Sequence, residues 1–277
     1  MVALIKKIIV FIFSNPILKK IISLDIYSFI DTLTVKTSNN RILFFGFGKM
    51  PVWRAKTFFT KEPETIEWIN SFSENDVFWD IGANVGIYSL YAASLKKNIK
   101  VSSFEPSAAN YFVLNRNIFM NHFDSQISAY PIAFSNNSIL GHFQMRSDEP
   151  GGAINVFSDA RLEETASGKE TVKINVRQAM LSFSIDSFIQ AYDPEFPNHI
   201  KIDVDNIEDK IVEGGMRTIS DLRVKSLLVE MDERDTEYCQ RVIALVHRAG
   251  LIHMEKKHSP MFDKGKFSSI YNFIFTR

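Results

Sequence analysis

The segment Asp76-Val-Phe-Trp-Asp80-Ile-Gly82-Ala-Asn84-Val-Gly86 decides the fold. The large apolar residues Val77 to Trp79 are typical of a parallel strand that is buried on both faces. An acid and a turn with two glycines follow, and an apolar helical pattern begins at Ile87. Glycines here allow a tight turn and a close approach to a ligand, and the first amide groups of the helix face the same crevice. This order predicts a site for a small cofactor.

Strands and helices alternate on both sides of this segment. Strands are predicted over residues 100–104, 127–134, 199–204 and 225–229, with a terminal strand pair over 251–256 and 269–275. Helices are predicted over residues 64–72, 87–97, from 107 onward, 184–191, 208–219 and 236–249. We therefore expect an α/β fold of the Rossmann-like, doubly wound type, with a mostly parallel seven-stranded sheet and an antiparallel last strand. Its ligands should lie at the carboxyl ends of the strands.

Three segments are distinguished along the chain. Residues 1–30 are an apolar N-terminal helical segment, residues 31–61 an accessory β-ribbon with strands over 32–37 and 41–47, and residues 62–277 the main domain. Within that domain, residues 135–181 interrupt the alternation and are interpreted as an insertion with strands over 141–145 and 171–176. Its loop 148–155, with Gly151-Gly152 as a hinge, is predicted to form a lid over the bound substrate.

The N-terminal segment has lysines at both ends of an apolar stretch. The uncharged run from Ile8 to Leu18 has eleven residues and contains Pro16, whereas a spanning helix needs about 20. No small-residue cleavage site of a signal peptide follows. We expect an amphipathic helix that packs on the domain, forms a homodimer contact or lies on the inner face of a membrane.

Composition narrows the class of partner. The 277 residues carry 32 Lys plus Arg and 32 Asp plus Glu, so the chain lacks the basic field of a nucleic-acid-binding protein. Cys239 is the single cysteine, which excludes an intramolecular disulfide framework and any multi-cysteine metal site. We expect a cytoplasmic protein that binds no nucleic acid.

A second acid, Glu105, ends the next predicted strand, 25 residues beyond Asp80. In doubly wound folds an acid at this place accepts hydrogen bonds from ribose hydroxyls. The turn reads Gly-x-Asn-x-Gly rather than the Gly-x-Gly-x-x-Gly of dinucleotide binders, and the carboxylate of Asp80 would repel a pyrophosphate. A nucleoside cofactor with a cationic end fits both acids.

These residues resemble the class I S-adenosylmethionine-dependent methyltransferases, and specifically their FkbM-type branch. The resemblance lies in residues 76–91, 104–106, 131–135, 184–188 and 201–205. It implies S-adenosylmethionine as the cofactor, with Glu105 on its ribose. It also implies which residues line the cofactor site. The strand end and the turn contribute Asp80, Gly82, Ala83, Asn84 and Gly86. The adenine side is bordered by Ala133, Phe134 and Ser135, and Tyr88 and Asp203 complete the lining.

The acceptor side is predicted where four acids fall within seven residues, Asp203, Asp205, Glu208 and Asp209. Such acids orient and deprotonate a hydroxyl or bind a divalent cation. The usual Asp-Val-Glu-Gly of the family reads Asp-Val-Asp-Asn here. The predicted catalytic residues are Asp203 first, Glu230 second, then Asp205, and we assign no metal ligand.

Two alternatives concern histidine and Glu230. The six histidines show no spacing typical of a metal site, and His199 precedes its strand, away from the active end. Glu230 acts as a general base if burial raises its pKa, or forms an ion pair with Arg234.

The leading hypothesis is an S-adenosylmethionine-dependent O-methyltransferase that acts on a hydroxyl of a saccharide or other small molecule. The resemblance alone suggests the saccharide. Two alternatives remain: a nicotinamide-dependent oxidoreductase or epimerase on the same fold, and a catalytically inactive, cofactor-binding partner protein.

Overall fold

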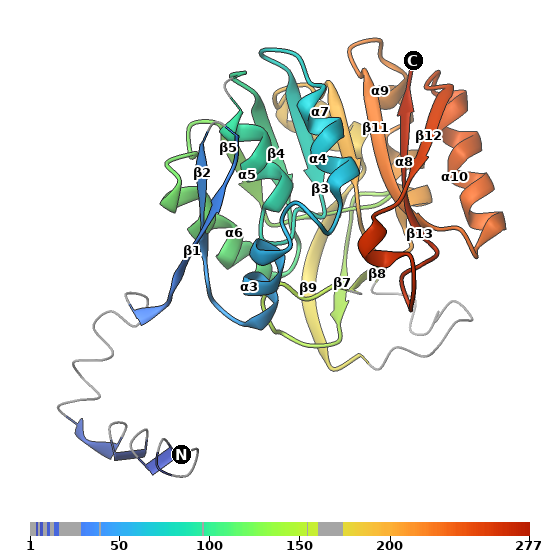
Figure 1. The fold of residues 1–277 in the computed structure, drawn as a ribbon. Coiled ribbons are helices and arrows are strands. Elements are labelled where there is room, and N and C mark those ends of the chain that lie inside the picture. Colours follow the sequence, from blue (N-terminus) through green and yellow to red (C-terminus); the bar gives the residue numbers. More distant parts are fainter. Residues whose placement is uncertain are drawn as a thin grey trace.

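The computed structural model describes residues 4, 6, 7, 10, 11, 14–16, 29–38, 40–95, 97–153, 155–159 and 174–277. A seven-stranded sheet lies at the centre of the fold (Figure 1). Every pair of neighbouring strands is parallel except for those that involve the last strand, which runs opposite to both of its neighbours. The order across the sheet is β12 (His253–Lys257), β13 (Ile270–Thr276), β11 (Ser226–Asp232), β10 (His199–Ile202), β3 (Val77–Ile81), β4 (Lys100–Phe104) and β5 (Ile127–Tyr130). The predicted fold class is confirmed.

Helices cover both faces of this sheet. Alternation along β3 explains the two layers, because Trp79 packs into one apolar cluster and Phe78 into the other. The face of Phe78 is covered by α4 (Pro63–Asn70), α5 (Ile87–Ser94) and α6 (Ala108–Met120). The face of Trp79 is covered by α7 (Ile185–Tyr192), α8 (Glu208–Gly214), α9 (Met216–Ser220) and α10 (Thr236–Arg248). The helix predicted over residues 208–219 is thus two helices, divided at Gly215.

The ribbon consists of β1 (Thr32–Lys36) and β2 (Arg41–Phe45), which pair as an antiparallel hairpin. It rests on α6, where the side-chain oxygen of Asn117 accepts a hydrogen bond of 2.7 Å from the backbone amide of Phe45. A helix that the sequence did not predict, α3 (Lys49–Lys56), follows the ribbon. It begins at Lys49 after Gly48, and its apolar residues Met50, Val52, Trp53 and Ala55 do not follow the i, i+3, i+4 spacing of an amphipathic helix.

The N-terminal helical segment, residues 1–30, lies mostly outside the described residues, so its helix and its contacts remain predictions. Among the described residues, no helix combines the length and the apolar content that crossing a bilayer requires.

A second sheet, of four strands, extends beyond the carboxyl edge of the central sheet (Figure 1). Its order is β6 (Ala133–Phe134), β9 (Val176–Phe183), β7 (Ile139–Met145) and β8 (Val156–Asp159). The predicted strand over 127–134 is corrected, because Pro131 has no amide for the ladder and the chain leaves the central sheet there. Of the strand predicted over 171–176, residues 171–173 lie outside the described residues, and the observed strand begins at Val176.

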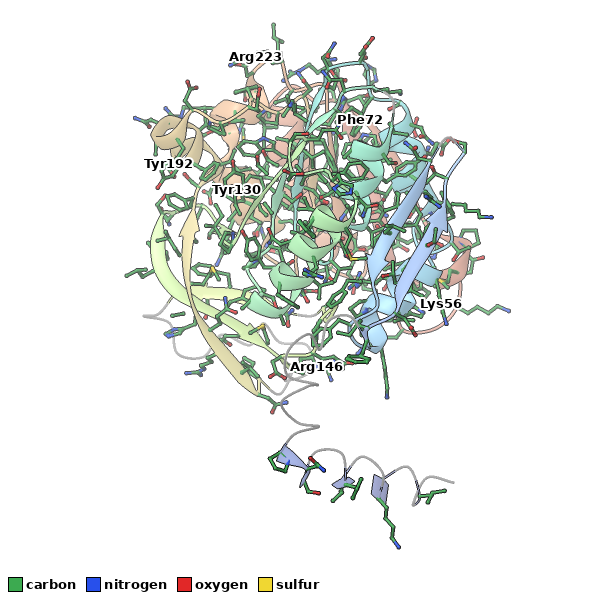
Figure 2. All side chains as sticks on the ribbon, turned by 90° about the vertical axis from the view of Figure 1, so that its left-hand side faces the viewer. Lys56, Phe72, Tyr130, Arg146, Tyr192 and Arg223 are labelled. Carbon is green, nitrogen blue, oxygen red and sulfur yellow. The ribbon has the colours of Figure 1, made fainter. Side chains whose placement is uncertain are left out.

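The parallel strands begin at one end of the molecule and finish at the other. Phe72 and Arg223 mark the end at which the parallel strands begin, and Lys56 and Arg146 mark the opposite end (Figure 2). The carboxyl ends of the strands therefore face α3 and the end of β7, and these two elements enclose the space in which a ligand would lie.

Replacing Gly82 by alanine tests how tightly the first turn is packed. Gly82 has φ of +86°, and a Cβ there would lie 2.0 Å from the carbonyl oxygen of Asp203. We expect Gly82→Ala to lower the free energy of unfolding by at least about 3 kcal/mol, because positive φ and steric overlap act together. Urea unfolding measures this value.

Gly265→Ala is the matched control, since Gly265 also has positive φ, +99°, but no atom within 4 Å of its added Cβ. It should cost roughly 1–2 kcal/mol. Equal losses in the two variants would contradict the packing argument.

Candidate functional site

The glycine turn joins β3 to α5, and its backbone is left-handed at three positions. Gly82, Asn84 and Gly86 have φ of +86°, +52° and +88°. A Cβ on Gly86 would lie 2.5 Å from Cδ1 of Leu114, and one on Gly82 would overlap the end of β10. The sequence predicted that the glycines approach a ligand, but packing within the protein is what requires them. Gly82 also brings the turn against Asp203.

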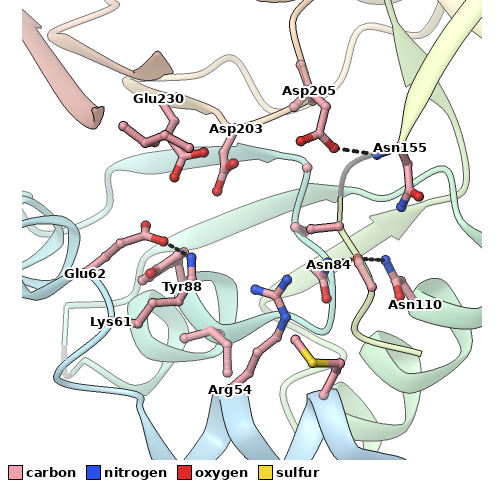
Figure 3. A pocket seen from close by; sticks show the side chains of 18 of the residues that line it. Arg54, Lys61, Glu62, Asn84, Tyr88, Asn110, Asn155, Asp203, Asp205 and Glu230 are labelled. Atoms are coloured by element: carbon pink, nitrogen blue, oxygen red, sulfur yellow. Dashed lines mark hydrogen bonds and ion pairs between the residues drawn. The ribbon is translucent and has the colours of Figure 1, made fainter. Parts of the chain in front are cut away.

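A cavity of about 540 Å³ opens at the carboxyl ends of the strands. The predicted residues that line it are Gly82, Ala83, Asn84, Tyr88, Glu105, Asp203, Asp205 and Glu230. The predicted residues that lie away from this lining are Asp80, Gly86, Ala133, Phe134 and Ser135. The cavity thus brings the turn, the ribose acid and all three predicted catalytic acids to one place (Figure 3).

Asp80 is fully buried beneath the turn. Its Oδ2 accepts a hydrogen bond of 2.5 Å from the hydroxyl of Ser89, which in turn accepts one of 2.7 Å from Ser103. Its Oδ1 has no hydrogen-bond partner among the described residues. Burial raises the pKa of this carboxyl group. Asp80 therefore supports the turn from below and keeps one acceptor atom uncommitted.

Glu105 is held by three donors at the wall of the cavity. Its Oε2 accepts from the amide of Asn84 at 2.8 Å, and its Oε1 accepts from the amide of Ser107 at 2.8 Å and from Asn110 Nδ2 at 3.4 Å. Burial raises its pKa to about 7. Glu105 thus links the end of β4 to the turn and to the start of α6, at the place predicted for ribose.

Two of the residues predicted to border adenine line a small recess beside the main cavity. Ala133 and Phe134 line this recess of about 20 Å³, whereas Ser135 lines neither. The ring of Phe134 packs at 4.7 Å, centroid to centroid, from Phe104. The recess and the main cavity share five lining residues: Gly82, Pro106, Phe143, Asn155 and Val204.

Lys201 was missed by the sequence reasoning, although a lysine between Ile200 and Ile202 in an apolar strand was a usable signal. Its side chain is 1% exposed, and its Nζ donates to Asp203 Oδ2 at 2.5 Å. Burial alone would lower its pKa, but Asp203, Glu62 and Asp80 raise it. In spite of burial, Lys201 holds the pKa of Asp203 at about 2. The pair is therefore ionised at neutral pH.

Three carboxylates meet beside this lysine. Glu62, Asp203 and Glu230 each offer an oxygen within 4.8 Å of the others, a spacing that suits a divalent cation. Lys61 pairs with Glu62, so lysines neutralise two of the three acids. Burial and the charges of Asp203 and Glu62 raise the pKa of Glu230 well above its ordinary value.

The structure places Arg234 and His199 as follows. Arg234 pairs with Asp232 at 2.6 Å. His199 lies at the start of β10, where its Nε2 is 2.9 Å from Asp76 Oδ2 and burial lowers its pKa to about 4. It is remote from the cavity, as predicted.

The predicted lid, residues 148–155, lies across the turn. Asn84 Nδ2 donates to the carbonyl of Gly152 at 2.8 Å, and the amide of Asn155 donates to Asp205 Oδ2 at 2.6 Å. One oxygen of Asp205 is thus used to hold this loop, which makes Asp205 a positioning residue in this geometry.

Arg54 comes from α3 and was not predicted, because that helix gave no signal. Its Nε donates to the carbonyl of Gly151 at 3.0 Å, and its guanidinium reaches into the cavity towards Asn84 (Figure 3). Within the described part of the chain, no carboxylate lies at ion-pair distance from it. Its outer N–H groups are therefore available to an anionic ligand group.

The fold and the site together define a Rossmann-like protein with a cofactor turn flanked by acids. A model of the methyltransferase FkbM domain matches residues 80–271, and the chain belongs to this family. S-adenosylmethionine is accordingly its cofactor.

Individual proteins are similar to parts of the chain. Methyltransferase sdnD of Sordaria araneosa is 28% identical over 162 residues, which cover 53% of this chain and 62% of that protein. Precorrin-6y C5,15-methyltransferase of Geobacter metallireducens is 12% identical with a TM-score of 0.44, over 78% of this chain and 87% of its own. A SAM-dependent O-methyltransferase of Thermotoga maritima is 10% identical with a TM-score of 0.44, over 88% and 77%.

The residues of the turn fit the amino-acid end of this cofactor. Asn84 lines the cavity, and its Oδ1 has no hydrogen-bond partner among the residues that the structure describes. This atom accepts rather than donates, so an ammonium group supplies the donor that it needs. Arg54 supplies the complementary cation for a carboxylate, because a guanidinium binds that group with two parallel hydrogen bonds.

Removing the charge of Lys201 tests the buried network. Lys201→Met leaves Asp203 buried without its cation, and we expect a loss of about 3–5 kcal/mol in unfolding free energy at neutral pH. The pKa of Asp203 then rises in the folded state, so the loss grows as pH increases and shrinks on acidification. Urea unfolding at several pH values measures it.

The double variant Lys201→Met/Asp203→Asn serves as the control and should recover part of the stability, since it removes the unpaired charge. A loss in Lys201→Met that is independent of pH would refute the electrostatic explanation.

Removing the guanidinium of Arg54 tests its fit to the cofactor. We expect Arg54→Met to weaken the binding of S-adenosylhomocysteine about 10–100-fold, because a charged hydrogen-bonded pair is lost. Methylthioadenosine, which lacks the amino-acid end, should bind both proteins equally. Isothermal titration calorimetry measures both ligands, and equal weakening of both would show a general distortion of the site instead.

Proposed function

We propose that the protein is an S-adenosylmethionine-dependent O-methyltransferase that acts on a hydroxyl group of a saccharide or other small molecule. One observation carries the proposal: a single cavity has the cofactor turn on one side and the acids Asp203 and Glu230 on the other. An oxygen acceptor held by these acids would lie beside the methionine part of the cofactor.

The cofactor supplies, when bound, a methyl group activated by a sulfonium. The chain has to hold the acceptor oxygen in line, exclude water and receive a proton. The loop over Asn84 excludes water. The deprotonated carboxylate of Glu230 accepts the hydrogen bond of the acceptor hydroxyl and receives its proton as the methyl group is transferred, and the fixed negative charge of Asp203 beside it favours the proton at that place.

The two acids divide these tasks because their environments differ. Asp203, with a pKa of about 2, is a weak base but a permanently charged hydrogen-bond acceptor. Glu230 has a raised pKa and is the stronger base. The electrostatics therefore favour Glu230 over Asp203 as the general base, the reverse of the ranking drawn from the sequence.

A small-molecule acceptor fits the charge balance of the chain better than a nucleic acid does. The single cysteine supports a reducing compartment, and we propose the cytoplasm. A homodimer or membrane contact through the N-terminal segment belongs to the same proposal, and deleting residues 1–24 would test it by light scattering and vesicle sedimentation.

Calorimetry and a transfer assay together test the function. Purified protein is titrated with S-adenosylmethionine, and methyl-labelled cofactor is incubated with small-molecule and glycan extracts. We expect binding and labelled product that is resistant to mild base, as an ether is. Binding without any transfer would favour the inactive partner, and no binding would remove the proposal.

The pH profile of Glu230→Gln tests the general base. A raised pKa means that the proton is retained to higher pH, so wild-type turnover should increase as the pH rises through the pKa of Glu230. The variant should lose about 100-fold or more in kcat together with this dependence. Cofactor affinity should be unchanged. A variant that keeps the rising limb would assign the base elsewhere.

A further inference from the structure

Polar side chains lie on one face of the central sheet near its carboxyl edge. Asp80 is paired in register with Ser103 on one side and with Lys201 on the other. The partner of Lys201 on β11 is Leu228, and Glu230 lies two residues farther along β11 on the same face. Glu230 is directly opposite Asn272 of β13, and residues paired in this way point to the same face.

Three buried polar atoms at this end of the cavity have no hydrogen-bond partner in the described part of the chain. They are Glu64 Oε2, Asn272 Oδ1 and His258 Nε2, and all three residues line the cavity. Glu64 is 6% exposed and Asn272 is 3% exposed. A buried polar atom without a hydrogen bond costs about 1–3 kcal/mol, so each is a binding position for a ligand.

Contacts with neighbouring residues determine which side-chain atoms can accept a hydrogen bond from a ligand. Asn272 Nδ2 donates to Glu64 Oε1 at 2.7 Å, so the amide of Asn272 offers its oxygen to the cavity. His258 Nδ1 lies 2.8 Å from the carbonyl oxygen of Ile270 and donates to it, which leaves Nε2 as an acceptor in the neutral ring. Asp263 is 3.7 Å from that Nε2, beyond hydrogen-bond distance.

A set of three acceptors selects a donor and rejects phosphates and carboxylates. Burial raises the pKa of Glu64. A hydroxyl donates its hydrogen bond without bringing a charge into this buried end of the cavity, whereas an ammonium has to lose its hydration there. The chemistry therefore favours hydroxyl groups.

The distance to the general base limits the size of the ligand. Adjacent strands are about 4.8 Å apart, so Glu230 and Asn272 are reached by two oxygens of one small molecule. Hydroxyls on one sugar or cyclitol ring have separations of this order. A molecule with a single hydroxyl would leave the three acceptors unsatisfied.

We propose that Glu64, Asn272 and His258 form an acceptor-recognition subsite, which binds further hydroxyls of a polyhydroxylated ring, one donated hydrogen bond to each acceptor atom, while another hydroxyl of the same ring lies at Glu230. The subsite rests on the proposed function. It gives that function its substrate class, a saccharide or cyclitol.

Saturation-transfer difference NMR tests the subsite on the full chain loaded with S-adenosylhomocysteine. The probes are methyl α-D-glucopyranoside, methyl α-D-galactopyranoside and myo-inositol, with their fully O-methylated derivatives and ethanolammonium as comparisons. Wild-type protein should show transfer to at least one polyol and none to its methylated derivative. Glu64→Gln and Asn272→Leu should weaken that binding about tenfold.

Glu67→Gln is the matched control, because Glu67 is on the same helix, is 73% exposed and pairs with Lys257. It should bind the polyol as the wild type does. Thermal unfolding of each variant checks the fold, and Glu64→Gln, which keeps the shape of the side chain, remains informative if Asn272→Leu does not fold.

Several results would overturn the subsite. They are unchanged polyol binding in both folded variants, equal transfer to the methylated derivative, preference for ethanolammonium, or no transfer to any polyol. Calorimetry with S-adenosylhomocysteine and the methyl-transfer assay on the same samples distinguish a failure of the proposed function from a failure of the subsite. Failure of both would remove the proposed function, whereas their success without polyol binding would remove the subsite alone.

Discussion

The ion pair between Lys201 and Asp203 is the interaction on which the site depends. A lysine in the middle of a buried parallel strand loses its hydration, and only neighbouring negative charge compensates for that loss. Asp203 supplies it directly at 2.5 Å, and Glu62 and Asp80 contribute from opposite sides. The lysine thereby fixes an ionised aspartate at the carboxyl end of β10, next to the glycine turn.

That fixed charge determines what the remaining acids can do. Because Asp203 stays ionised, a proton on the neighbouring Glu230 is strongly favoured, and one carboxylate cluster contains both a permanent acceptor and a titratable base. Lys61 pairs with Glu62 and compensates its charge, as Lys201 does for Asp203. The same arrangement reduces the need for a metal ion, since lysines already neutralise two of the three acids at the spacing that a cation would use.

The sequence predicted the part of the site that local pattern encodes. A strand that ends in an acid, a glycine turn and a helix start are contiguous in the chain, so Asp80, the turn and Glu105 were found together with the sheet that positions them. The sequence did not indicate the close packing at Gly82, because the contact of Gly82 with Asp203 joins residues 121 positions apart. Arg54 and the pair of Glu64 with Asn272 had no local signal either, since long-range packing alone brings them to the cavity.

The walls of the cavity come from two parts of the chain. The family match begins at residue 80, whereas Arg54, Lys61, Glu62 and Glu64 lie before it and still line the cavity. The turn and the strand ends bind a cofactor that never changes, and they are constrained by close backbone packing. The preceding segment is held mainly by side-chain contacts such as that of Asn272 with Glu64. Under the proposed function, Glu62 and Glu64 of this segment lie on the acceptor side together with Asn272 of β13, whereas Arg54 lies on the cofactor side. The segment before the family match would then contribute to both parts of the site.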